Sequence, residues 1–156
     1  MLGPPAPLGW CPVTAMDPDL FREAMSRFAS GVTVVTSNRG DLRVGITASS
    51  FVSVSADPPM VLVCLTRVHP AHSVIEEVRA FAVNILGAHQ LEIGLRFAGL
   101  RPEITDRFLG LACALGVTGS PLLVDSLASL DCRLVKTHEG GDHAILIGEV
   151  VHAQVA

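Results

Sequence analysis

Short apolar runs rich in β-branched residues follow one another along this chain, and turn signals separate most of them. Such runs are typical of strands. We expect about six strands, at 32–37, 42–55, 60–65, 81–86, 127–136 and 144–155. The run 42–55 is expected to bend at Ser49-Ser50, and Pro58-Pro59 to interrupt the ladder. A turn at 38–41 and a longer glycine loop at 137–143 predict two hairpins.

Three other segments have helical spacing. Asp17-Pro18 is typical of an N-cap followed by proline at the first helical position. Apolar residues then recur at helical spacing until Gly31 ends the run: Leu20, Phe21, Ala24, Met25 and Phe28. Further short helices are expected at 72–78 and 90–97, whereas residues 101–119 have no clear pattern.

The strands follow one another and do not alternate with long helices. We therefore expect a mainly β fold, an antiparallel barrel or an α+β arrangement, and not a doubly wound parallel sheet. The 156 residues suit one domain, with a flexible Pro- and Gly-rich leader at 1–16 and the folded part at 17–156. The leader lacks the pattern of a signal peptide, and no apolar run reaches the roughly 18 residues that span a bilayer. We expect a cytoplasmic protein with no membrane partner.

Charge and motifs exclude several function classes. The net charge is −4 and the basic residues are scattered, which argues against a nucleic-acid partner. The chain contains neither a dinucleotide-binding glycine motif, a P-loop nor a Gly-x-Ser-x-Gly elbow. No Cys-x-x-Cys pair is present, and Cys64 and Cys132 stand in apolar runs where cysteine is usually a small buried hydrophobe.

The pair of histidines in His69-Pro70-Ala71-His72 has no acid or cysteine at ligand spacing, so we expect no metal site. We expect His72 instead to cap or flank the start of a helix, where an anion can bind.

Residues 45–55 are the strongest candidate for a ligand site. The segment begins as a strand and then carries small residues, Ala48, Ser49 and Ser50, where a core strand would carry bulk. Small side chains let a flat ligand approach the backbone, and the hydroxyls of Thr47 and the two serines can donate and accept hydrogen bonds. The alternative is an ordinary hairpin strand with a polar outer face.

A second candidate is Gly141-Asp142-His143, in the glycine loop of the second hairpin. His143 could bind a carbonyl, a ring nitrogen or a phosphate. In the alternative, Asp142 closes an Asx-turn and His143 is the first residue of the next strand. The frequency of Gly-Asp turns favours this alternative when the segment is taken alone.

Several segments, in their order and spacing, are similar to the flavin reductase-like family, whose fold is the FMN-binding split barrel. They lie between Asp17 and Val151. The matching segments are 21–25, 28–36, 45–51 together with 53–55, 57–65, 81–86, 96–99, 107–108, 130–132, 141–143 and 147–150.

The resemblance implies an antiparallel, Greek-key-like split barrel that forms a homodimer. It implies an NAD(P)H:flavin oxidoreductase that reduces FMN or FAD with NADH or NADPH and supplies a separate monooxygenase. Three sets of residues match the family's site. Thr47, Ala48, Ser49 and Ser50 match the segment that lines the flavin ring and ribityl chain. Cys64, Leu65 and Thr66 match the strand end beside the flavin, and Arg67 and His72 match the residues that hold the flavin phosphate. Gly141, Asp142 and His143 match the loop around the nicotinamide donor.

This assignment explains why no catalytic triad or carboxylate pair is present, since the two cofactors carry the hydride chemistry themselves. Val68-His69-Pro70-Ala71 departs from the family pattern and favours an alternative, a flavin-binding electron carrier without nicotinamide-dependent activity. A third possibility is a small dimeric interaction module that binds no flavin.

Overall fold

The computed structural model describes residues 16–156. Within this range it contains three short α-helices, α1 (Pro18–Ser26), α2 (Pro70–Val78) and α3 (Leu91–Phe97), and a 3₁₀ turn η1 (Ala88–Gln90). The strands are β1 (Thr33–Arg39), β2 (Leu42–Ala48), β3 (Val52–Ala56), β4 (Pro59–Thr66), β5 (Ala80–Ile85), β6 (Cys113–Leu115), β7 (Pro121–Leu123), β8 (Ala128–Gly140) and β9 (His143–Val155). The expectation of a flexible leader at 1–16 falls, except for Met16, outside the described residues.

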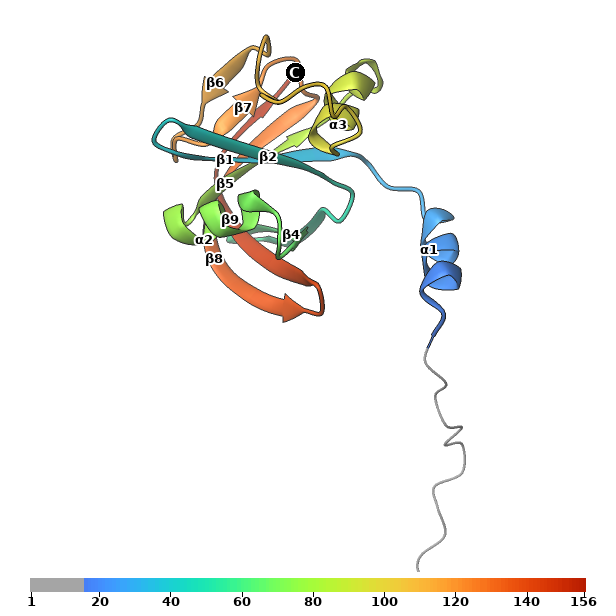
Figure 1. Cartoon of the computed structure of the whole chain (residues 1–156). Helices are drawn as coiled ribbons and strands as arrows, with labels where there is room; N and C mark the ends of the chain where they lie inside the picture. The colour runs from blue at the N-terminus through green and yellow to red at the C-terminus, as the bar shows by residue number, and fades with distance from the viewer. Residues whose placement is uncertain (1–15) are drawn as a thin grey trace, which may run out of the picture.

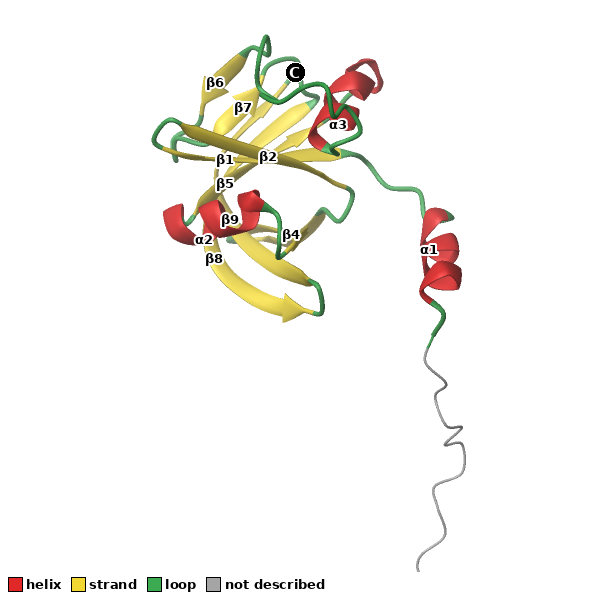
Figure 2. Ribbon diagram, viewed as in Figure 1, coloured by secondary structure: helices red, strands yellow, loops and turns green. Residues whose placement is uncertain are grey.

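Seven strands form one antiparallel sheet in the order β2-β1-β5-β8-β9-β4-β3. Figure 2 shows the strands of the molecule in yellow. The sheet contains three hairpins, β1–β2, β3–β4 and β8–β9. Crossovers join β2 to β3 and β4 to β5, and β5 lies beside β8. Buried side chains from β1, β2, β4, β5, β8 and β9 meet in one cluster with Ile75 of α2. The sheet therefore curls around a common core, and the expected mainly β barrel is confirmed.

The long strand expected at 42–55 is two strands, β2 and β3, at opposite edges of the sheet. The break lies at 49–51, where the bend at the two serines is expected, and there the Ser50 hydroxyl bonds to the backbone of Cys64 in β4. The interruption expected at Pro58-Pro59 is shorter than predicted. Pro59 is already the first residue of β4, opposite Ala56, a position where a missing N–H is tolerated.

The longer loop expected at 137–143 is wrong. Strands β8 and β9 stay paired until Gly140 faces His143, which leaves a two-residue turn of Gly141 and Asp142. Of Gly140 and Gly141, only Gly141 has a positive φ, at 70°. A positive φ at the first of the two turn residues is typical of a type II′ hairpin turn, and glycine adopts it readily. His143 is the first residue of β9, as one part of the alternative interpretation predicts, whereas the Asp142 carboxylate contacts the His143 ring.

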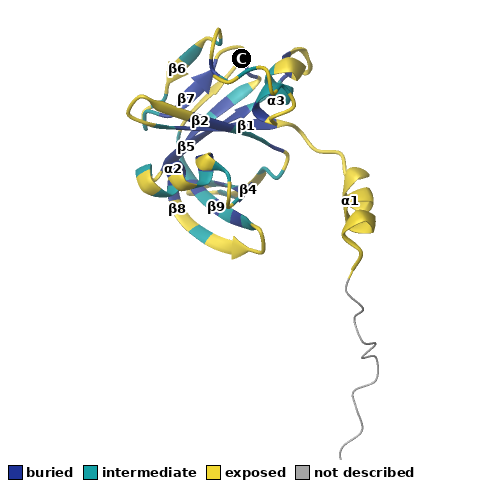
Figure 3. Cartoon of the chain, viewed as in Figure 1, coloured by how far each residue is buried: buried dark blue, intermediate teal, exposed yellow. Residues whose placement is uncertain are grey.

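Helix α1 begins as expected, since the Asp17 carboxylate accepts a hydrogen bond from the Asp19 amide at 2.9 Å and Pro18 follows the cap. The helix ends at Ser26, however, and does not continue to Gly31. It buries no side chain and stands away from the barrel on an extended segment (Figures 1 and 3).

Helix α2 begins at Pro70, two residues before the predicted start. The cap is His69, whose Nδ1 accepts a hydrogen bond from the Ala71 amide at 3.1 Å. His72 therefore does not cap the helix, but it flanks the helix start in the first turn, which is the other placement expected for it. Among residues 16–156, no helix combines the length and the apolar character that crossing a membrane requires.

Residues 101–119, which have no clear sequence pattern, contain β6, and β6 pairs with β7 in a separate two-stranded sheet. Phe108 from this region packs edge-on against Phe97 of α3, with ring centroids 5.0 Å apart. A second small core under α3 results.

Candidate functional site

The fold brings together three segments that are far apart in the sequence. Ser50 is hydrogen-bonded to Cys64, Thr66 pairs with His143, and the Arg67 amide donates to the Asp142 carbonyl oxygen at 3.1 Å. The end of β2, the end of β4 and the β8–β9 turn are therefore neighbours along one edge of the barrel. Nearly all of the residues expected to bind flavin or nicotinamide lie on these three segments.

The four residues at the end of β2 are not equivalent. The Thr47 hydroxyl donates to the Gly94 carbonyl oxygen at 2.7 Å, and Ala48 is buried beneath the strand. The Ser50 hydroxyl donates to the Cys64 carbonyl oxygen at 2.9 Å and accepts from the Cys64 amide at 3.0 Å. Ser49 is exposed at the break between β2 and β3. Of these hydroxyls, that of Ser49 faces solvent, whereas those of Thr47 and Ser50 are hydrogen-bonded to the backbone of α3 and β4.

Residues at the end of β4 alternate between the core and the other face of the sheet, as strand geometry requires. The Leu65 side chain is 1% exposed and packs in the main core, so only its backbone could meet a ligand. Cys64 and Thr66 are half-buried on the other face, and Cys64 is a free thiol. The two residues Cys64 and Thr66 can therefore border a ligand that lies over β4.

Basic residues follow directly after β4. The Arg67 side chain is exposed, and its guanidinium lies 3.8 Å from the Glu139 carboxylate. The turn after Thr66 closes with a hydrogen bond from the His69 amide to the Thr66 carbonyl oxygen, and α2 begins at once. Half-buried His72 lies in the first turn of α2, where its amide donates to the His69 carbonyl oxygen at 3.0 Å.

His69 has a neighbour that the sequence pattern does not indicate. The Arg107 guanidinium lies 3.4 Å from His69 Nε2 and also donates to the Phe97 carbonyl oxygen at 3.2 Å. Burial, and then the positive charge of Arg107, lower the pKa of His69 below its ordinary value. His69 is therefore held neutral, as its capping role requires.

In the β8–β9 turn, the Asp142 carboxylate lies 2.8 Å from His143 Nδ1. The hydrogen bond from His143 lowers the pKa of Asp142 below its ordinary value. Asp142 is thus placed to orient the half-buried His143 ring. When Nδ1 carries the hydrogen of this bond, Nε2 is the ring atom that can meet a ligand.

An apolar groove of about 310 Å³ opens beside Thr47. Its walls come from the residue before β1, from the connection after β5, from η1 and from α3 with its C-cap: Val32, Leu86, Ala88, Leu91, Leu95 and Ala98. The sequence pattern does not assign these residues to a ligand site. Gly87 and Gly94, which also line the groove, are the signal that could have found it, since glycines let the backbone border a cavity.

The groups along this edge are of the kinds that a flavin and a nicotinamide would contact. Small residues, an exposed hydroxyl, an exposed guanidinium and an oriented imidazole lie along one edge, and an apolar groove opens at Thr47. In the part of the chain that the structure describes, no group of three or more His, Cys, Asp or Glu side chains is placed to hold a metal ion.

Comparison with known proteins gives a consistent result. Residues 25–156 match the family model described as the flavin reductase like domain. The chain is 37% identical over 135 residues to the flavin-dependent monooxygenase reductase subunit HsaB of Mycobacterium tuberculosis, covering 86% of this chain and 71% of that one. It is also 37% identical over 135 residues to the FMN reductase (NADH) RutF of Agrobacterium fabrum, with 86% and 77% covered.

A solved structure shares both the fold and the sequence. It is the NADH:FAD oxidoreductase of Streptomyces globisporus in complex with NAD and FAD fragments. The TM-score is 0.83 and the identity 37%, over 90% of this chain and 83% of that one.

Proposed function

Because this chain belongs to the flavin reductase-like domain family, we propose that it is an NAD(P)H:flavin oxidoreductase that reduces FMN or FAD by hydride transfer. Its product, reduced flavin, supplies a separate flavin-dependent monooxygenase. The observation that carries this proposal is the meeting of the β2 end, the β4 end and the β8–β9 turn at one edge of the barrel.

The flavin is assigned to the ends of β2 and β4. The side chain of Ser49 and the backbone of residues 47–50 face the ring and ribityl chain, with Cys64 and Thr66 beside them. Arg67 and His72 bind the phosphate, and the exposed guanidinium of Arg67 is suited to that role. Small residues at 48–50 leave one face of the ring open to the donor.

The nicotinamide is assigned to Gly141, Asp142 and His143. Asp142 holds the His143 ring with Nε2 free to accept a hydrogen bond, which suits the carboxamide of the donor. When bound, the cofactors supply the chemistry, since the hydride passes from the nicotinamide ring to the flavin without a protein acid or base. The residues of this chain orient the two rings, and backbone amides at 48–50 offset negative charge on the product.

The test is the loss of absorbance at the nicotinamide band, with NADH and NADPH each supplied against FMN and FAD. His143→Ala is expected to lower kcat/KM for the nicotinamide by about tenfold, the equivalent of one lost hydrogen bond. Flavin affinity is expected to stay unchanged. His138→Ala is the matched control, because His138 is an exposed histidine of the same hairpin. Flavin binding without any nicotinamide oxidation by the wild type would indicate the electron carrier instead.

We propose further that the protein is a homodimer in which α1 contacts the second subunit. The apolar side chains of α1 and the segment after it are 50–73% exposed: Leu20, Phe21, Met25 and Phe28. An exposed apolar helix face of this kind favours association. Sedimentation should give a dimer for the wild type, and Phe21→Asp with Met25→Asp should shift it towards monomer. A wild-type monomer would refute the proposal.

The cytoplasm is the proposed location. Cys64, Cys113 and Cys132 are free thiols, which suits a reducing compartment with a supply of reduced nicotinamide.

A further inference from the structure

The outer part of the β8–β9 hairpin lacks a neighbouring strand on one side. Strand β5 pairs with β8 only from Ala128 to Arg133, because β5 begins at Ala80. Strand β8 nevertheless continues to Gly140, and the hairpin projects past the end of β5 (Figure 1). We call residues 134–147 the arm. The turn assigned to the nicotinamide lies at the tip of this arm.

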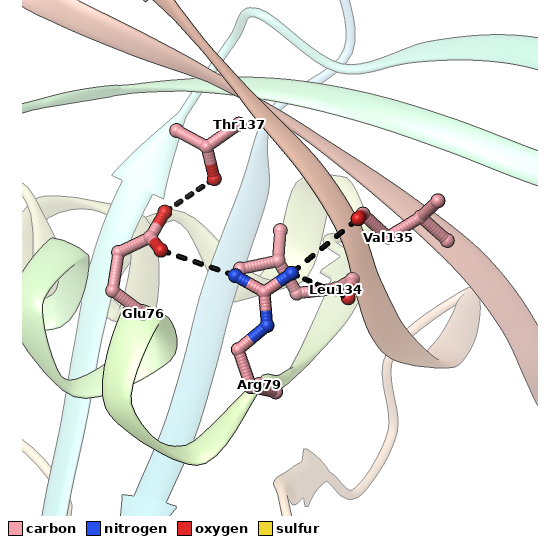
Figure 4. Close-up of polar contacts among 5 residues, drawn as sticks. All are labelled: Glu76, Arg79, Leu134, Val135 and Thr137. Carbon is pink, nitrogen blue, oxygen red and sulfur yellow. Dashed lines mark hydrogen bonds and ion pairs between the residues drawn. The ribbon is translucent and has the colours of Figure 1, made fainter.

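The C-terminal end of α2 contacts β8 just beyond the residues that pair with β5, as Figure 4 shows. The Arg79 guanidinium donates to the carbonyl oxygens of Leu134 and Val135, at 3.2 and 3.3 Å. The Arg79 carbonyl oxygen also accepts a hydrogen bond from the Leu134 amide at 3.0 Å. These contacts fall where the β8–β9 register shifts between Leu134 and Lys136, so they hold the arm at its bulge.

Glu76 completes the connection. Its carboxylate accepts a hydrogen bond from Arg79 at 3.2 Å through one oxygen and from the Thr137 hydroxyl through the other. Thr137 faces Leu146 on β9, and Gly140 faces His143. At about 3.3 Å per residue, Thr137 lies roughly 10 Å along the strand from the turn.

We propose that Glu76 and Arg79 are positioning residues that hold the arm, and thereby His143, at the nicotinamide. The proposal rests on the function and the donor site proposed above. The β9 strand of the arm pairs with β4 as far as Thr66 and His143. Strand β4 therefore holds the β9 strand of the arm, and α2 holds its β8 strand. Exposed ion pairs contribute little to stability, whereas a displacement of about 1 Å at a reacting group costs far more in rate.

The experiment compares Thr137→Val, which removes one hydroxyl at constant shape, with Thr137→Ser, which keeps it. Glu76→Gln is the second variant. Glu77→Gln is the matched control, since Glu77 is the next residue of α2 and pairs with Arg39 of β1 instead of the arm. For Thr137→Val and Glu76→Gln we expect KM for NADH to rise about three- to tenfold. KM for flavin should stay at the wild-type value, and the melting temperature should fall by only about 1–6 °C, the equivalent of one hydrogen bond. Every parameter of Thr137→Ser and Glu77→Gln should stay at the wild-type value.

Hydrogen exchange gives a readout that does not depend on turnover. Amides of 138–143 should exchange faster in Thr137→Val than in Thr137→Ser. Equal exchange in the two variants would overturn the proposal, and so would an unchanged KM for NADH or an equal rise in both Michaelis constants. Wild-type protein with no nicotinamide oxidation would refute the proposed function itself. If the wild type is inactive but Thr137→Val still exchanges faster than Thr137→Ser, Glu76 and Arg79 hold the arm, and the arm does not serve a nicotinamide site.

Discussion

Removing the hydroxyl of Ser50 should destabilise the protein, whereas removing that of its neighbour Ser49 should not. Ser50 Oγ makes two hydrogen bonds to Cys64, at 2.9 and 3.0 Å, and these join the break after β2 to strand β4. Each net hydrogen bond contributes about 0.5–1.5 kcal/mol, so Ser50→Ala should lower the free energy of unfolding by about 1–3 kcal/mol. Ser49 is exposed, and Ser49→Ala should change this free energy by less than about 0.5 kcal/mol.

Urea unfolding of the apo protein measures this difference. With a denaturant slope of about 2 kcal/mol per molar, the midpoint of Ser50→Ala should fall by roughly 0.5–1.5 M. Quenching of flavin fluorescence then measures binding, and Ser49→Ala should weaken it by about five- to tenfold through one lost hydrogen bond. A wild-type midpoint for Ser50→Ala, or an equal loss of stability in Ser49→Ala, would refute the division of roles between the two serines.

Two further changes test the core and the cap of α2. A Cβ on Gly148 would lie 2.5 Å from the Phe81 ring, so Gly148→Ala should cost about 1–3 kcal/mol in urea unfolding, whereas Gly31→Ala, with open space around it, should cost little. The lowered pKa of His69, caused by burial and then by Arg107, means that the unfolded chain binds the proton first as the pH falls. This contribution to stability is complete above the ordinary pKa of 6.5 and is lost as the pH drops from there to the lowered value in the folded state. His69→Asn keeps a capping side chain, so its unfolding midpoint should decline less than that of the wild type between about pH 7.5 and 5.5, and parallel declines would contradict this account.

Much of the fold can be predicted from local sequence patterns. The start of α1 follows from Asp17-Pro18, because a carboxylate cap and a proline at the first helical position act within one turn. Most strands follow from short β-branched runs bounded by turn signals, which are visible along the chain itself. The ends of strands are harder to predict where a strand distant in sequence determines them. Strand β8 continues to Gly140 because β9 pairs with it, not because its own residues favour a strand.

Sequence by itself determined the mainly β class, the order of the elements and the residue types available at the site, since these depend on spacing along the chain and on side-chain chemistry. Only the tertiary structure decided what each group is free to do. Ser49 and Ser50 have the same side chain, yet the Ser50 hydroxyl is bound to a strand 14 residues away, while Ser49 faces solvent. The contact of Arg79 with the arm spans 55 residues, and no local pattern can encode a partner at that distance.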